Sequence, residues 1–155
     1  MKNLIPVILN VEQVVTCLTS SYLLTRLGRK TILQTGTLGG TVSLIFIALG
    51  FAIKESYLDL ANGLVLAGLA LFMANFGMSL GPVVWLYIPE ILEPKYIPIS
   101  TLANWAGAAA VMFLYPILSK SLGPVPLFLF FAIWCAVSFF FGQKFIVETK
   151  GKEEK

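Results

Sequence analysis

Five long apolar stretches limit what this chain can fold into. A bilayer core of about 30 Å is crossed by about 20 residues of helix, and each stretch reaches that length. Only 12% of the residues are charged, whereas soluble domains carry about 25%. The sequence therefore predicts an all-α membrane protein whose bundle occupies residues 1–147. The five predicted transmembrane helices cover about residues 4–25, 31–53, 61–89, 99–119 and 123–147.

The charged residues exclude several classes of function. The chain has no histidine and only eight acidic residues, so few side chains could bind a metal or carry out acid–base chemistry. We expect no metal site, no cofactor and no enzymatic activity, because Glu12 has no second carboxylate to form a catalytic pair within the membrane. The net charge of +3 is small and scattered, so no nucleic-acid partner is expected.

Basic residues are distributed unevenly between the two ends of the predicted bundle. Eight lie at one end: Arg26, Arg29, Lys30, Lys95, Lys144, Lys150, Lys152 and Lys155. Three lie at the other: Lys2, Lys54 and Lys120. The positive-inside rule places the richer end in the cytoplasm, together with a polar and frayed tail at 148–155. With five helices the N-terminus faces outward, and we expect the chain to be the later part of something longer.

A Gly81-Pro82 pair interrupts the third apolar stretch. Proline removes a backbone hydrogen bond and bends a helix. Within the membrane such a break is tolerated where protein or a water-filled cavity satisfies the freed groups, and transporters use broken helices to build substrate sites. A packing kink is the other interpretation, since both residues are common in membrane helices.

Polar residues recur every three or four positions in the first stretch: Glu12, Gln13, Thr16, Thr19 and Ser20. This spacing places them on one helix face, which we expect to look into the bundle. Hydroxyls in such helices often bond only to backbone or a neighbouring helix. Because a charge in the membrane is costly and usually marks a pathway, Glu12 is a candidate proton site; the alternative is a protonated or headgroup-level side chain.

Amides and indoles gather in the third and fourth stretches. Asn75 and Ser79 precede the Gly-Pro pair, Trp85 follows it, and Asn104-Trp105 lies in the next stretch. Amides offer donors and an acceptor, and an indole offers an apolar face with one N–H. This combination suits a sugar, although tryptophan also serves as an interfacial anchor.

Four motifs in order resemble the sugar-porter branch of the major facilitator superfamily, which includes the facilitative glucose transporters. Residues 26–30 (Arg-Leu-Gly-Arg-Lys) are similar to the basic loop between the family's helices eight and nine. Residues 81–85, followed by Glu90, resemble the Gly-Pro-x-x-Trp…Glu signature of helix ten. Asn104-Trp105 matches a pair in helix eleven, and residues 147–151 resemble the Pro-Glu-Thr-Lys-Gly tail. The resemblance covers the chain as helices eight to twelve, a partial C-terminal bundle.

The resemblance implies roles for residues at matching positions. Trp85, Asn104 and Trp105 would line the sugar site, with Gln13 as a polar contact from the first helix. A cytoplasmic latch would stabilise the outward-open state through four residues: Arg26, Arg29, Glu90 and Glu148. The chain departs from the family pattern at Val147, where the tail motif has proline.

The resemblance also implies hexose transport by alternating access, in a multi-pass protein of the plasma membrane. Two six-helix halves rock around a central site in such carriers, so we expect activity to need the missing N-terminal half or another chain. The alternatives are an inactive transporter fragment and a non-transporting module, a sensor or an assembly partner. The tail of about eight residues argues against a sensor.

Overall fold

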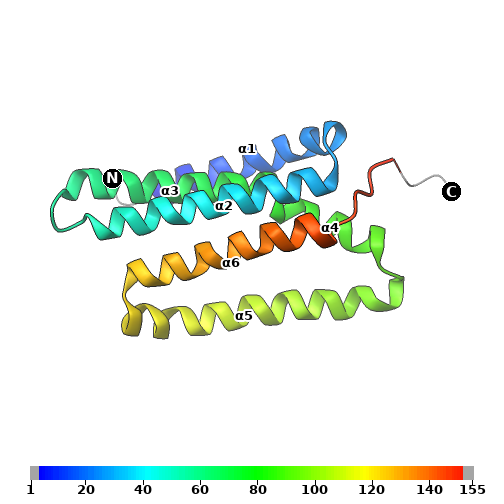
Figure 1. Cartoon of the computed structure of the whole chain (residues 1–155). Helices are drawn as coiled ribbons and strands as arrows, with labels where there is room; N and C mark the ends of the chain where they lie inside the picture. The colour runs from blue at the N-terminus through cyan, green and yellow to red at the C-terminus, as the bar shows by residue number, and fades with distance from the viewer. Residues whose placement is uncertain (1–3, 152–155) are drawn as a thin grey trace.

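The computed structural model describes residues 4–151, with side chains from Val7 onward, and this part of the chain is all-α (Figure 1). The expected all-α membrane fold is confirmed. Its elements are α1 (Leu4–Arg26), α2 (Arg29–Ala52), α3 (Leu58–Met78), α4 (Leu80–Ile91), the 3-10 turn η1 (Pro94–Tyr96), α5 (Ile97–Leu122) and α6 (Pro124–Phe145).

Five segments of the described chain are long and apolar enough to cross a membrane. The third of them, Leu58–Ile91, contains both α3 and α4. Glycine lies at two of the junctions between segments: Gly28 precedes α2, and Gly123 has a positive φ of 77° between α5 and α6. A positive φ is accessible to glycine because it lacks a Cβ, so α5 and α6 can turn back as a hairpin.

The expected single helix at 61–89 is divided at Ser79, two residues before the Gly81-Pro82 pair. Ser79 leaves helical geometry, with φ −129° and ψ −88°. Pro82 has no N–H for the carbonyl of Met78, and its ring would crowd that carbonyl. The effect of the proline therefore falls four residues upstream, and α4 starts afresh with the Val83 N–H bonded to Ser79 O at 3.0 Å.

Close contact between α2 and α3 forms the centre of the bundle. The buried residues of α2 recur every three or four positions from Ile32 to Gly50, as expected for one packed helix face. A Cβ at Gly68 of α3 would lie 2.9 Å from the Ser43 carbonyl oxygen of α2. Small residues let membrane helices approach this closely, so glycine sets the distance between these helices.

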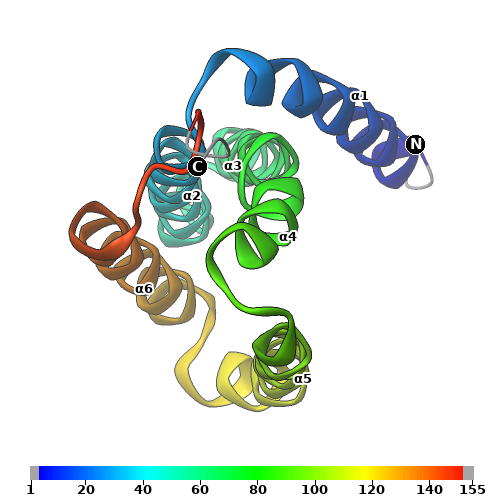
Figure 2. The same cartoon turned by 90° about the vertical axis from the view of Figure 1, so that its right-hand side faces the viewer.

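The helices form an incomplete ring that opens between α1 and α5, as the end-on view shows (Figure 2). α2, α3 and α6 lie together on one side, and α4 lies toward the middle. No residue of α5 is buried among the described residues. Its apolar side chains, such as Met112 and Phe113, are more than three-quarters exposed and lie at a surface suited to lipid or to further protein.

The expected last helix, 123–147, ends earlier, at Phe145. Residues 146–151 form a segment that crosses the end of the bundle near α1, α2 and α4, and we call it the strap (Figure 1). The expected frayed tail is therefore wrong for residues 148–150, whose side chains bond to the helices as described below. Residues 152–155, including Lys152 and Lys155, lie outside the described part of the chain, as does Lys2.

We predict that Gly68→Ala destabilises the protein by about 1–3 kcal/mol, because overpacking at a backbone contact forces α2 and α3 apart. Thermal unfolding in detergent, followed by circular dichroism, measures this. Gly63→Ala is the matched control on the same helix, since a Cβ there meets nothing within 4 Å and alanine favours the helix. Equal melting temperatures for the two variants would contradict the prediction.

Candidate functional site

An open groove between α4 and α5 brings together three of the predicted sugar-site residues. Trp85 comes from α4, and Asn104 and Trp105 come from α5. The groove has a volume of about 730 Å³. The two indole rings lie with centroids 6.4 Å apart and planes inclined by 34°. Side chains from two different helices, with the turn η1 between them in the sequence, thus line one groove.

The lining of this groove is largely apolar. Gly81, Ala103 and Gly107 leave room beside the two indoles. Asn104 is exposed, and within residues 4–151 its side chain makes no hydrogen bond, so the amide is available to a ligand. Ligand sites commonly combine an apolar lining with a few oriented polar groups. Such a surface can stack a sugar ring and bind its hydroxyls.

Asn75 and Ser79 lie elsewhere, at the contact of α3 with α2. The Asn75 amide donates to Leu71 O at 2.7 Å and occupies the space beside Gly39. Ser79 is only 3% exposed; its hydroxyl donates to Asn75 O and lies against Gly36. Both side chains thus serve helix packing at the break, and they do not line the groove of the two tryptophans.

Gln13 belongs to a third location, the contact between α1 and α3. Gln13 and Thr16 lie over Gly77, where an added Cβ would overlap them. Ser20, one turn after Thr16, is fully buried. Three members of the predicted polar face of α1 therefore look into the bundle.

The other two members of that face behave differently. Thr19 is exposed and bonds only to Val15 O. Glu12 is half-buried and forms no ion pair with any described residue. Of the three interior residues, Gln13 and Thr16 meet α3 at Gly77, and Ser20 is buried.

At the strap end of the bundle, Arg29 and Glu90 form an ion pair. The Arg29 Nη2 and Nε atoms lie 2.9 and 3.1 Å from the same Glu90 oxygen, Oε1. The side chains are 19% and 14% exposed. Partial exclusion of water strengthens the attraction, and the other Glu90 oxygen accepts a hydrogen bond from the Thr149 hydroxyl. The pair joins α2, α4 and the strap.

Glu148 caps the N-terminus of α2. Its Oε1 accepts the Arg29 backbone N–H at 2.8 Å, one of the amides that a helix start leaves without an intrahelical partner. Negative charge is favourable at this end of a helix. The carboxylate occupies the space where Gly28 lacks a side chain, so a larger residue at position 28 would displace it.

Arg26 lies apart from this charge cluster. Its guanidinium stands 5.6 Å from the centre of the Tyr22 ring on its own helix, and it forms no ion pair among the described residues. Instead, Lys150 contacts the end of α1: its ammonium group donates a hydrogen bond to Thr25 O at 2.9 Å. Three of the four predicted latch residues meet, and the fourth does not.

Sequence reasoning missed four residues that hold this end together. The Lys30 ammonium group donates a hydrogen bond to Gln143 O at 2.9 Å. This places a positive charge at the C-terminal end of α6, where the helix dipole favours it. The others are Tyr87, Thr149 and Lys150. The available signal for Tyr87 was its spacing of three residues from Glu90, which places both on one face of a helix.

Comparison with known proteins identifies the family of this chain. The family model described as "Sugar (and other) transporter" matches residues 2–154. The chain belongs to this sugar transporter family. It is therefore a multi-pass membrane protein, and the resemblance found from the motifs is confirmed.

Relatives within the sugar transporter family come from several kingdoms. Hexose transporter 1 of Plasmodium yoelii yoelii is 35% identical over 85% of this chain and 26% of its own length. D-xylose-proton symporter-like 1 of Arabidopsis thaliana is 31% identical over 95% and 29%. Facilitated trehalose transporter Tret1 of Polypedilum vanderplanki is 29% identical over 97% and 31%. The chain spans less than a third of the length of these three relatives.

We predict that Glu90→Gln lowers the stability of the protein by about 1–3 kcal/mol, since it weakens hydrogen bonds made by a charged, half-buried group. Glu93→Gln is the matched control, because Glu93 pairs with Lys95 at the surface, with side chains 67% and 64% exposed. Exposed pairs contribute at most about 1 kcal/mol. Thermal unfolding should separate the two variants; a larger loss for Glu93→Gln would contradict this assignment.

Proposed function

We propose that this chain forms the C-terminal part-bundle of a sugar carrier that moves a hexose by alternating access. Its partner is a missing N-terminal half or another chain, because alternating access requires one bundle to move relative to a second one. The family assignment supports sugar as the substrate class, and relatives named as hexose and trehalose transporters agree with it.

The observation that carries this proposal is the groove of Trp85, Asn104 and Trp105. Its volume of about 730 Å³ falls within the range of about 300–1,000 Å³ typical of small-molecule sites. Helix α5, which lines this groove, borders the open side of the ring between α1 and α5 (Figure 2), where a second bundle would lie in this proposal. We infer that the sugar binds between the two halves at this groove.

The strap end fits a conformational latch of this carrier. In this proposal the cluster of Arg29, Glu90 and Glu148 stabilises the outward-open state, and its opening accompanies the inward-facing one. A few kcal/mol of differential stability suffices to shift such a two-state equilibrium. The positive-inside rule places this end in the cytoplasm, in a protein of the plasma membrane.

The other predicted residues have different places in this proposal. Gln13, Asn75 and Ser79 support the groove through helix packing, since each lies at an interface of α3. Proton coupling, if the carrier uses it, would involve Glu12, the ionisable group within α1.

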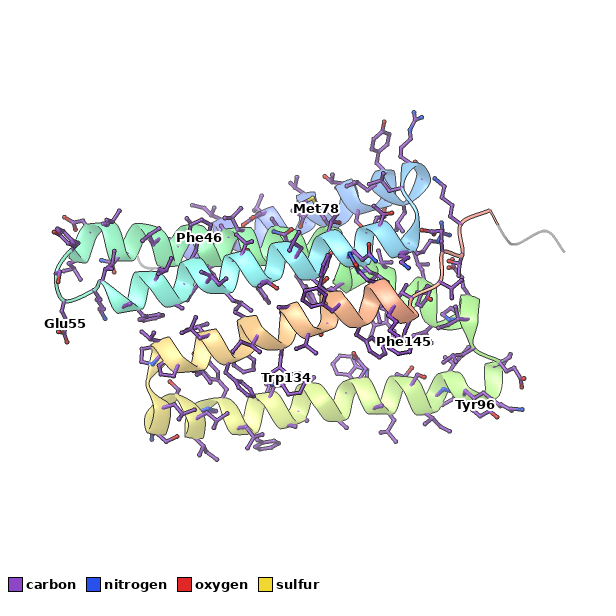
Figure 3. All side chains as sticks on the ribbon, in the orientation of Figure 1. Phe46, Glu55, Met78, Tyr96, Trp134 and Phe145 are labelled. Atoms are coloured by element: carbon purple, nitrogen blue, oxygen red, sulfur yellow. The ribbon has the colours of Figure 1, made fainter. Side chains whose placement is uncertain are left out.

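We predict that Trp85→Ala and Asn104→Ala each lower sugar uptake at least about tenfold, because they remove a stacking face and a hydrogen-bonding amide from the groove. Uptake of radiolabelled hexose into liposomes measures this, using the chain assembled with its N-terminal half. Trp134→Ala is the control, since Trp134 lies on α6 (Figure 3), packs edge-on against Phe130 and does not line the groove.

Insertion of each variant should match the parent, as judged by the amount of folded protein in the liposomes. Unchanged uptake kinetics in both groove variants would reject the groove as the sugar site. Absence of uptake by the parent assembly would instead favour an inactive fragment or a non-transporting assembly module.

A further inference from the structure

We propose that Tyr87 is the positioning residue of the strap: its hydroxyl holds the backbone of Val147 so that Glu148 reaches the N-terminus of α2. This inference deepens the latch described above and rests on that proposed function for its consequence in transport. The contact itself is a property of the folded chain and is testable without transport.

One hydroxyl makes two hydrogen bonds to a single residue of the strap. The Tyr87 hydroxyl donates to Val147 O at 3.1 Å and accepts the Val147 N–H at 3.0 Å. A phenol can do both at once. The N–H and C=O of an extended residue point to the same side, which is how paired antiparallel strands exchange two bonds. Tyr87 therefore binds Val147 as a neighbouring strand would.

The contact depends on the backbone of Val147 rather than on its side chain. That side chain is 55% exposed, so its burial contributes little to docking. Because successive side chains of an extended segment point to opposite sides, an outward Val147 turns Glu148 inward. The Glu148 carboxylate then meets the Arg29 N–H at 2.8 Å and the Lys150 N–H at 3.2 Å.

The ring of Tyr87 is itself held by apolar packing. It lies against the buried cluster of Ile32, Leu33 and Val83, which joins α2 to α4. The strap residue Ile146 packs on the same cluster. A fixed ring places the hydroxyl at a fixed point near the end of α6. The strap is bound there at Val147, just before the residues Glu148 and Thr149 that bond to α2 and α4.

Hydrogen exchange of the full chain in lipid nanodiscs, read at single residues by mass spectrometry, tests whether the contact of Glu148 with α2 depends on the Tyr87 hydroxyl. Tyr87→Phe keeps the ring and removes the hydroxyl. We expect the amides of both Val147 and Arg29 to exchange about tenfold faster, as a docked segment does on losing one or two neutral hydrogen bonds. Tyr96→Phe is the control, because Tyr96 is exposed and its ring contacts Lys95 (Figure 3).

Glu148→Gln separates positioning from general docking. With Tyr87 intact, this variant should speed exchange at Arg29 while Val147 stays protected. The proposal is overturned if Tyr87→Phe leaves Arg29 protected, or if Glu148→Gln exposes Val147 as much as Tyr87→Phe does. Exchange reports on the strap whether or not the assembled protein carries sugar, so failure of the transport proposal would be recognised separately, by uptake.

Discussion

The missing hydrogen bond at Pro82 is the constraint on which the rest of this structure depends. It ends α3 at Met78 and lets α4 begin in a new direction after Ser79. Because α4 is a separate helix, it can turn Trp85 toward α5 and Glu90 toward α2. A continuous helix through this span would hold both at the rotation set by the packing of α3 on α2. The groove and the charge cluster therefore share one structural origin.

Glycine supplies the second constraint, through close approach rather than unusual backbone angles. Gly39 and Gly68 bring α2 and α3 into contact, Gly36 admits Ser79 at the helix break, and Gly77 admits the polar side chains of α1. In a membrane the gain from apolar burial is small, because lipid is as apolar as leucine, and close packing replaces it. This explains why Gln13, Asn75 and Ser79 act in packing: polar side chains next to glycine bond locally and fill the interface.

The strap end of the bundle and its open side differ in what covers them. At the strap end, the helix starts and ends are satisfied by side chains from distant positions, such as Glu148 on α2 and Lys150 on α1. On the opposite side of the bundle, α5 has no buried residue within the described chain and the ring stays open (Figure 2). Polar groups thus join four of the five segments at the strap end, all but the one that contains α5, while the apolar side chains of α5 stay exposed.

The sequence alone determined the membrane class, the five spanning segments and the family, because hydropathy, charge and short motifs are local properties of the chain. It also predicted that Trp85 and Asn104 line the same site and that Arg29 pairs with acidic residues. Only the tertiary structure decided that Asn75 lies outside the groove of Trp85 and Trp105, that Arg26 stands apart from the charge cluster, and that the Tyr87 hydroxyl bonds to the strap. The reason is helix rotation: spacing shows which residues share a face, but glycine contacts and the break at Ser79 decide which face meets which helix.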